Sequence, residues 1–154
     1  MRKAVFAGSF DPITLGHENV VRRSVSLFDE IIVAVGVNFN KESRFSKEDR
    51  IVMLEAVFSD LPSVMVQSYS GLTADFCMEI GASWLLRGVR NSSDFEYECT
   101  IAQMTKKLAP TLETTILFTK EEFSSISSTI VRDVIANGGD VSEFVPAAAL
   151  EFIK

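Results

Sequence analysis

Short apolar runs alternate along this chain with longer segments in which apolar residues recur every third or fourth position. The short runs predict β-strands at residues 4–7, 30–37, 64–66, 83–86 and 114–118. The periodic segments predict amphipathic helices around residues 17–28, 46–58, 72–80, 91–110 and 129–137. Pro146 is well placed to open a short last helix.

This alternation predicts one α/β domain over residues 1–154, with a Rossmann-like, doubly wound sheet of five parallel strands. In the strand order 3-2-1-4-5, the first and fourth strands are neighbours and the order reverses between them. Ligands of such sheets bind at the carboxyl ends of the strands at this reversal. We therefore expect the segments that leave these two strands, Gly8–His17 and Arg87–Arg90, to converge on one site.

Composition and net charge limit the class of protein and the kinds of partner that it can bind. The 154 residues are 47% hydrophobic, which excludes a disordered chain, and no apolar run approaches the roughly 20 residues of a membrane-spanning helix. The formal net charge of −6 disfavours nucleic acid, so an anionic substrate needs a local basic pocket. Met1-Arg2-Lys3 leads into a strand rather than a signal peptide, and Cys77 and Cys99 lack CxxC spacing. These features predict a cytoplasmic protein with free thiols and no membrane partner.

The segment Gly8–His17 carries the most specific chemistry. Two glycines and Pro12 shape a crossing from strand to helix, and His17, the only histidine, falls in the first turn of that helix. Free N–H groups and the positive end of the helix dipole favour an anion there, and glycine lets the backbone approach a phosphate closely. A tight turn with a surface histidine is the alternative interpretation of the same residues.

The other polar residues suit the transfer of a phosphoryl or nucleotidyl group better than covalent catalysis. The sequence contains no Gly-x-Ser-x-Gly nucleophile elbow and no paired histidines for a metal. It offers a single histidine, a few cations and helix N-termini. Such groups can position two anions and stabilise the charge that develops between them.

Each further candidate also has a purely structural interpretation. Lys41 can be a solvated loop lysine, and Glu98 can lie on a solvated helix face. Arg87 and Arg90 end an apolar strand, where they can form surface ion pairs or contact phosphate. The hydroxyls of Ser127–Thr129 can cap a helix or hold a phosphate. Three aromatic side chains are expected in the core rather than stacked on a ligand: Phe10, Phe95 and Tyr97.

Several separate segments resemble the bacterial phosphopantetheine adenylyltransferase family, one of the nucleotidylyltransferases with an (H/T)xGH signature. The signature reads Thr14-Leu15-Gly16-His17, inside a longer Gly-Ser-Phe-Asp-Pro-Ile-Thr-x-Gly-His pattern. The further markers are the Lys41 loop, Phe45-Ser46-x-Glu48-x-Arg50, Arg87-Gly88-Val89-Arg90, Asp94-Phe95-Glu96-Tyr97-Glu98, Ile126-Ser127-Ser128 and Gly138-Gly139-Asp140-Val141. Because the markers follow one another along essentially the whole chain, the match is more specific than the short signature alone.

The resemblance implies an enzyme of coenzyme A synthesis. Such an enzyme transfers the adenylyl group of ATP to 4′-phosphopantetheine and releases dephospho-CoA and pyrophosphate. The resemblance further implies Mg²⁺ as cofactor, a homohexamer, and direct attack of the acceptor phosphate on the α-phosphorus without an enzyme-bound intermediate. In this scheme, His17 binds ATP phosphate and stabilises the transition state.

The resemblance also implies roles for other positions. The acceptor would be held by Ser9, Lys41, Thr73 and Arg87. ATP would be held by Ser9, Phe10, His17, Gly88, Val89, Arg90, Glu98, Phe123, Ser124, Ser125, Ile126, Ser127, Ser128 and Thr129. The chain departs from the usual pattern at Glu42-Ser43, where a Lys-Pro pair is common, and at Thr105, where asparagine is common.

Three other interpretations stay open from the sequence. The run Ile126–Arg132 is closer to the ISSTxIR motif of nicotinamide-mononucleotide adenylyltransferases, which favours a nicotinate or nicotinamide mononucleotide as acceptor. Against this, those enzymes normally carry histidine where Thr14 stands. A non-catalytic nucleotide-binding module is weakened by the presence of His17, Lys41 and both arginines. A flavodoxin-like or response-regulator domain shares only the architecture, and no acidic cluster ends the first strand.

Overall fold

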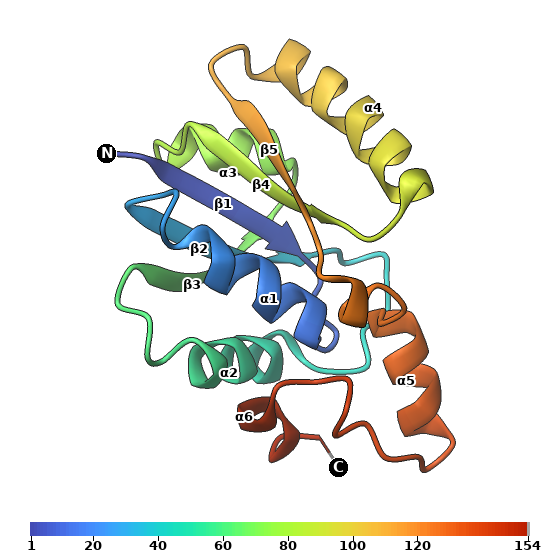
Figure 1. The fold of residues 1–154 in the computed structure, drawn as a ribbon. Helices are drawn as coiled ribbons and strands as arrows, with labels where there is room; N and C mark the ends of the chain where they lie inside the picture. The colour runs from blue at the N-terminus through green and yellow to red at the C-terminus, as the bar shows by residue number, and fades with distance from the viewer. Residues whose placement is uncertain (154) are drawn as a thin grey trace.

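The five predicted strands form one parallel sheet in the order β3-β2-β1-β4-β5 (Figure 1). The strands are β1 (Lys3–Gly8), β2 (Glu30–Val37), β3 (Val64–Ser70), β4 (Trp84–Val89) and β5 (Glu113–Phe118). The computed structural model describes residues 1–153. It confirms the predicted strand order, and with it the reversal between β1 and β4. Three strands match the prediction to within about a residue, whereas β3 and β4 run beyond the predicted ends, to Ser70 and Val89.

Helices connect the strands and cover both faces of the sheet (Figure 1). They are α1 (Leu15–Ser24), α2 (Lys47–Val57), α3 (Thr73–Glu79), α4 (Ser92–Leu108), α5 (Ser128–Ala136) and α6 (Ala147–Leu150), with a 3₁₀ turn η1 at Glu121–Phe123. Side chains of Ser46, Asn91 and Ser127 cap α2, α4 and α5 by accepting a backbone N–H. At the other end of α3 and α5, Gly81 and Gly138 adopt φ of +69° and +72°, which glycine does without strain.

The core lies on the two faces of the sheet because successive strand residues point to opposite sides. In β1, Ala4 and Phe6 pack with α1, α2 and α6, whereas Val5 and Ala7 pack with α3. Every strand position between Ala4 and Ala7 is buried, as expected for a parallel strand covered on both faces. A smaller cluster centred on Val131 joins α5 to the C-terminal segment.

Helix α4 departs from the sequence-based expectation. Its apolar residues follow helical spacing, yet Tyr97, Met104 and Leu108 are 66%, 54% and 55% exposed. The prediction that Phe95 and Tyr97 belong to the core is wrong, whereas Phe10 is buried as predicted. Periodicity shows that a helix has an apolar face, but it does not show whether this chain covers that face.

Two further expectations concern free cysteine thiols and membrane-spanning helices. Cys77 is buried, Cys99 is half-buried, and both are free thiols as predicted. Burial raises the pKa of the Cys77 thiol to about 11, so this thiol is protonated at neutral pH. Within residues 1–153, no helix has the length and apolarity needed to cross a membrane.

Candidate active site

The turn between β1 and α1 places His17 at the reversal of the sheet. Thr14 is the N-cap of α1, and its Oγ1 accepts the His17 N–H at 3.4 Å. In return, the Thr14 N–H donates to Nδ1 of the His17 ring at 3.0 Å, which completes a capping box. Phe10, which has a left-handed φ of 47°, packs its ring edge-on against the imidazole with centroids 5.1 Å apart. The imidazole is therefore held by hydrogen bonds with Thr14 on one side and by the Phe10 ring on the other.

This geometry determines the protonation state of His17. A backbone N–H can only donate, so Nδ1 must be unprotonated to accept it, and the ring proton of the neutral form lies on Nε2. Burial, followed by the positive charges of Arg87 and Arg90, lowers the pKa of His17 to about 4. At neutral pH, His17 is thus a neutral hydrogen-bond donor through Nε2 and not a cation.

The two arginines at the end of β4 are held by acidic partners from α4. Arg87 donates from Nε and Nη2 to both carboxylate oxygens of Glu98, at 2.8 and 2.7 Å. The Arg90 Nε donates to Asp94 at 3.1 Å, and its Nη1 reaches the Ile126 carbonyl at 3.2 Å. Bidentate pairing fixes the orientation of a guanidinium plane. The Arg87 plane is therefore fixed by Glu98, whereas Arg90 is held at two separate nitrogens, by Asp94 and by the Ile126 carbonyl.

An opening in the sheet brings these residues beside His17. The pairing of β1 with β4 covers Ala4–Trp84 and Val5–Leu85, and beyond it Arg87 Nη1 reaches across to the Ala7 carbonyl at 2.9 Å. Gly88 allows α1 to approach β4, because a Cβ at this position would lie 2.8 Å from Cγ2 of Val20. The helix and the strand thus converge on one crevice at the carboxyl edge of the sheet.

Three adjoining cavities lie along the carboxyl edge of the sheet, and Arg87 and Tyr97 border all of them. The first, about 340 Å³, contains His17, Arg90 and the N-terminus of α5. The second, about 890 Å³, lies between the turn at Ser9, the loop at Asn38–Asn40 and the end of β3. The third, about 330 Å³, is mostly apolar and is bordered by Leu72, Met104 and Leu108.

The structure brings most of the predicted site residues to these cavities. The first is lined by Phe10, His17, Arg87, Gly88, Arg90, Glu98, Ile126, Ser127 and Ser128. The second is lined by Ser9, Thr73 and Arg87. Six predicted residues are not part of any of the three linings: Lys41, Val89, Phe123, Ser124, Ser125 and Thr129. Of these, Val89 is fully buried in β4, and Lys41 is exposed on the loop next to the second cavity.

Some lining residues were not among the predicted ones. Asp94 holds Arg90 and lines the first cavity, and Tyr97 borders all three. Thr119 also lines the first cavity, and its N–H donates to the Val89 carbonyl at 2.9 Å. Asp94 and Tyr97 lie in the marker run 94–98. Asp94 precedes Tyr97 by three residues and Glu98 by four, and this helical spacing could have placed the three side chains close together.

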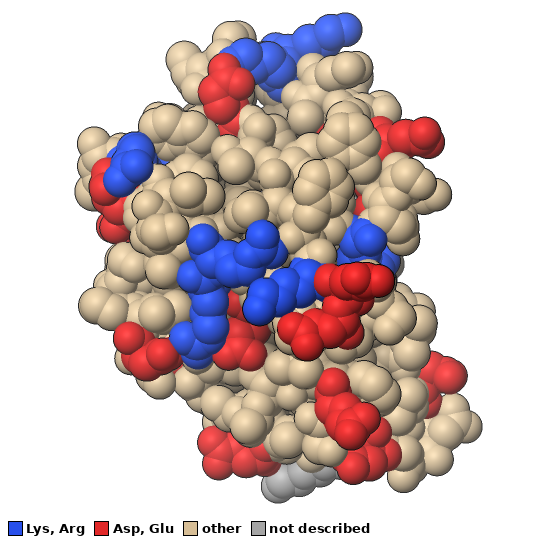
Figure 2. Space-filling view, viewed as in Figure 1, with Lys and Arg blue, Asp and Glu red and all other residues tan. Residues whose placement is uncertain are grey.

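The charge of the surface is uneven. The net charge is −6, yet Lys and Arg side chains gather across the middle of the face in Figure 2, with acidic side chains around and below them. Within residues 1–153, no three His, Cys, Asp or Glu side chains are grouped to hold a metal ion. The carboxylates that line the first cavity, Asp94 and Glu98, are already paired with arginines. These donors do not fit a resident metal ion bound by protein ligands alone.

Comparison with known proteins agrees with this geometry. Residues 5–134 match the cytidylyltransferase-like family model. A phosphopantetheine adenylyltransferase of Flavobacterium psychrophilum is 55% identical over 148 residues, which cover 96% of this chain and 97% of the relative. Relatives with the same description in Lachnoclostridium phytofermentans and Staphylococcus carnosus are 43% and 45% identical, and each alignment covers 99% of this chain and 94% of the relative. The chain belongs to the phosphopantetheine adenylyltransferase family.

Membership of this family confirms the resemblance drawn from the motifs, including the nucleotidyltransferase class. The fold also occurs in a solved structure of a different description. A solved structure from Vibrio parahaemolyticus, provisionally assigned as a nicotinate-nucleotide adenylyltransferase, superposes with a TM-score of 0.71 over 99% of this chain and 91% of its own. Its sequence is only 20% identical, so this likeness concerns the fold and not the substrate.

Proposed function

We propose that this chain transfers the adenylyl group of ATP to 4′-phosphopantetheine, giving dephospho-CoA and pyrophosphate in coenzyme A synthesis. The observation that carries the proposal is the near full-length identity to phosphopantetheine adenylyltransferases, 55% to the Flavobacterium psychrophilum relative. The three adjoining cavities that meet at Arg87 support it, because they offer two anion-binding sites and an apolar channel side by side.

In this proposal, ATP occupies the first cavity. Its phosphates lie against His17, Arg90 and the N-terminus of α5, where Ser127 and Ser128 line the cavity. The N–H groups and the dipole of a helix start suit phosphate oxygens. Gly88 lines this cavity from β4. In the proposal, Phe123–Ser125 and Thr129, which flank Ile126–Ser128 along the chain, also contact the nucleotide.

The acceptor occupies the second and third cavities. Its phosphate lies between Ser9, Lys41 and Arg87, and its pantetheine arm runs past Thr73 toward the apolar wall of α4. The Thr73 hydroxyl is held by Tyr69 at 2.7 Å, so it is fixed at the boundary between these two cavities. Thr105 borders the third cavity, at the place where the family commonly has asparagine.

The chemistry is an in-line displacement without a covalent enzyme intermediate. A phosphate oxygen of the acceptor forms a bond to the α-phosphorus of ATP, and the bond from this phosphorus to the bridging oxygen of pyrophosphate breaks. Charge builds on the oxygens of the α-phosphate as this happens. His17 donates a hydrogen bond from Nε2 to one of them, and Arg87 and Arg90 hold the two reacting anions together.

We propose that Mg²⁺ enters as part of the nucleotide substrate. The ion takes oxygen ligands and usually binds proteins through substrate phosphates and retained water. It neutralises the phosphate charge of ATP, while the residues of the chain orient that nucleotide. This agrees with the absence of a metal-ligating cluster within the described residues.

We also propose that the chain forms a homohexamer. Phe95 in the first turn of α4 and Phe118 at the end of β5 are 41% and 65% exposed and stack on each other, which supplies an apolar surface for contact between copies outside the three cavities. Light scattering should give a mass six times the 17.0 kDa of one chain. Phe118→Glu should lower this mass, and a monomeric wild-type protein would contradict the proposal.

The acceptor is tested by pyrophosphate release from ATP. We expect release with 4′-phosphopantetheine and none above background with nicotinate or nicotinamide mononucleotide. Release with a mononucleotide only would favour the alternative that the Ile126–Arg132 run suggests. Tight ATP binding without release for any acceptor would favour a non-catalytic nucleotide-binding module.

A further inference from the structure

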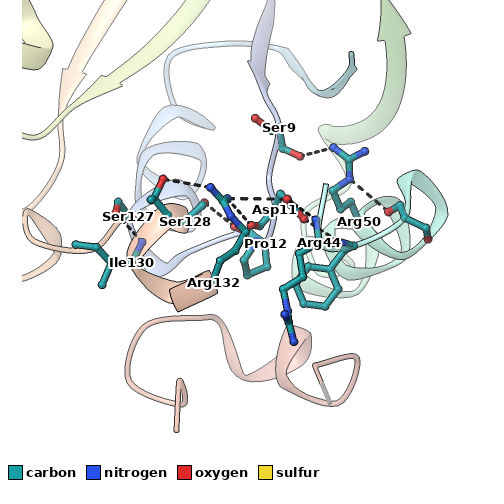
Figure 3. Close-up of polar contacts among 12 residues, drawn as sticks. Ser9, Asp11, Pro12, Arg44, Arg50, Ser127, Ser128, Ile130 and Arg132 are labelled. Atoms are coloured by element: carbon teal, nitrogen blue, oxygen red, sulfur yellow. Dashed lines mark hydrogen bonds and ion pairs between the residues drawn. The ribbon is translucent and has the colours of Figure 1, made fainter. Parts of the chain in front are cut away.

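Asp11 is a buried carboxylate for which the proposed chemistry has no use. Its side chain is 7% exposed, and the residue lines none of the three cavities. Both carboxylate oxygens accept backbone N–H groups from one loop, Oδ2 from Arg44 and Oδ1 from Phe45, each at 2.9 Å (Figure 3). A buried carboxylate with two amide donors is a strong, charge-assisted link. It joins the turn before His17 to the loop that carries Lys41.

Helix α5 holds the same turn from another side (Figure 3). Nη1 of Arg132 donates to the Asp11 carbonyl at 2.8 Å and lies 3.9 Å from its Oδ2. The Ser128 hydroxyl donates to the Pro12 carbonyl at 2.8 Å. Arg132 therefore supplies the positive charge that a buried carboxylate requires, and it ties the ATP-side helix to the turn.

A third link comes from α2. Arg50, only 4% exposed, donates from Nη1 to the Ser9 carbonyl at 2.9 Å and from Nε to the Ser46 carbonyl at 3.3 Å. The turn at 9–12 is thus fixed by α2 and α5, whereas the loop at 38–45 reaches this turn through Asp11. Within the loop itself, Lys41 N–H donates to the Asn38 carbonyl at 3.1 Å, and the Lys41 side chain is exposed.

We propose that Asp11 is a positioning residue, which holds the Lys41 loop at a set distance from the turn that carries His17. This inference rests on the proposed function, in which Lys41 binds the acceptor phosphate and ATP binds beside His17. Asp11 touches neither substrate; it acts through the amides of Arg44 and Phe45, three and four residues after Lys41. Its loss should therefore affect binding of the acceptor much more than binding of ATP.

Asp11→Asn tests this role with nearly unchanged side-chain shape. The new amide NH₂ faces one of the two loop N–H groups, so one bond is lost and two donors meet. We expect the KM for 4′-phosphopantetheine to rise about tenfold, which corresponds to about 1.4 kcal/mol, with kcat and the KM for ATP within about twofold. The matched control is Asp140→Asn, because Asp140 also accepts a backbone N–H, from Ser142, but lies on an exposed turn.

A double-mutant cycle with Lys41→Ala separates a positioning role from general damage. If Asp11 acts through Lys41, then adding Asp11→Asn to Lys41→Ala should leave the KM for the acceptor within about twofold of the Lys41→Ala value. A purely structural role would instead give additive effects and would raise the KM for both substrates. Additive effects, or an equal rise for ATP, would overturn the inference.

Arg44→Pro serves if Asp11→Asn does not fold. It removes one of the two N–H donors from an exposed loop residue and leaves the buried carboxylate intact. We expect the same selective rise in the KM for the acceptor, and an unchanged value in the folded variant would overturn the inference. A failure of the proposed function looks different, because the wild-type enzyme would then release no pyrophosphate with 4′-phosphopantetheine.

Discussion

The first and second cavities are neighbours, yet they are built in different ways. In the first, His17 accepts a hydrogen bond from Thr14, and Arg87 and Arg90 donate to Glu98 and Asp94. The second is more than twice as large, about 890 Å³ against 340 Å³, and is bordered by the exposed residues Asn38–Asn40. The difference indicates that the groups next to the reacting phosphorus are preorganised, whereas the acceptor side depends on how its loop is held.

The largest expected effect comes from removing the fixed donor of the first cavity. His17→Ala should lower turnover by about 10²–10³, the usual result of losing one donor to a transition state, and should leave the fold intact. Steady-state pyrophosphate release measures the turnover, and Trp84 fluorescence during urea unfolding checks the fold. A folded variant with wild-type turnover would remove His17 from the mechanism.

Breaking an ion pair of the first cavity should lower the free energy of unfolding. In Glu98→Gln, the Arg87 guanidinium keeps one acceptor and faces an NH₂ group in place of the other. We expect the free energy of unfolding to fall by about 2 kcal/mol, because Glu98 is nearly buried.

The control for this pair is Glu113→Gln, which breaks the exposed contact of Glu113 with Lys106. It should change the free energy of unfolding by less than about 0.5 kcal/mol. Urea unfolding measures both variants. Equal losses would show that the Arg87–Glu98 pair is no more important than an ordinary surface contact.

The low pKa of His17 predicts that the stability of the fold depends on pH, with a smaller effect than the two losses above. The folded protein has a His17 pKa of about 4, below the ordinary value of 6.5, so the unfolded chain binds the proton more readily between these values. The contribution of His17 to stability is complete above about pH 6.5 and is lost as the pH falls toward 4. His17→Gln should flatten this part of the stability curve.

The titration can be followed directly, because His17 is the only histidine. The single imidazole signal in a proton NMR titration of the ligand-free protein should have its midpoint near 4. A midpoint near 6.5 would mean that the imidazole is solvated and not fixed by the capping box.

The smallest expected effect concerns the cap itself. Thr14→Ala removes the hydroxyl that accepts the His17 N–H and should cost about 1 kcal/mol of stability. The Thr14 N–H still donates to Nδ1, so the imidazole keeps its orientation and turnover should fall by less than about threefold. Thr14→Ser should behave as wild type, and a loss of turnover as large as that of His17→Ala would contradict this separation.

The sequence predicted the parts of the fold that depend on local patterns. Apolar runs and helical periodicity located the strands and helices, and the switch-point rule placed the segments at Gly8 and Arg87 beside each other. The spacing of Thr14 and His17 also placed the imidazole in the first turn of α1, as the structure has it.

Other features depend on contacts that no local pattern reveals. From the sequence alone, Asp11 is expected only to be part of a turn. Its partners Arg44 and Phe45 lie 33 and 34 positions away, so no local pattern shows the contact. Tyr97 was expected in the core, since its apolar spacing does not show that α4 leaves that side open to the cavities. The pairing of both arginines with acids of α4 likewise depends on how α4 returns over the end of β4.

A crystal structure with bound dephospho-CoA would test most directly whether both reactants meet beside His17. We predict that an oxygen of the adenylyl phosphate lies within hydrogen-bonding distance of His17 Nε2, and that the pantetheine arm lies in the third cavity between Leu72 and Met104. A phosphate held away from the imidazole, or an arm bound at another edge of the sheet, would contradict this arrangement.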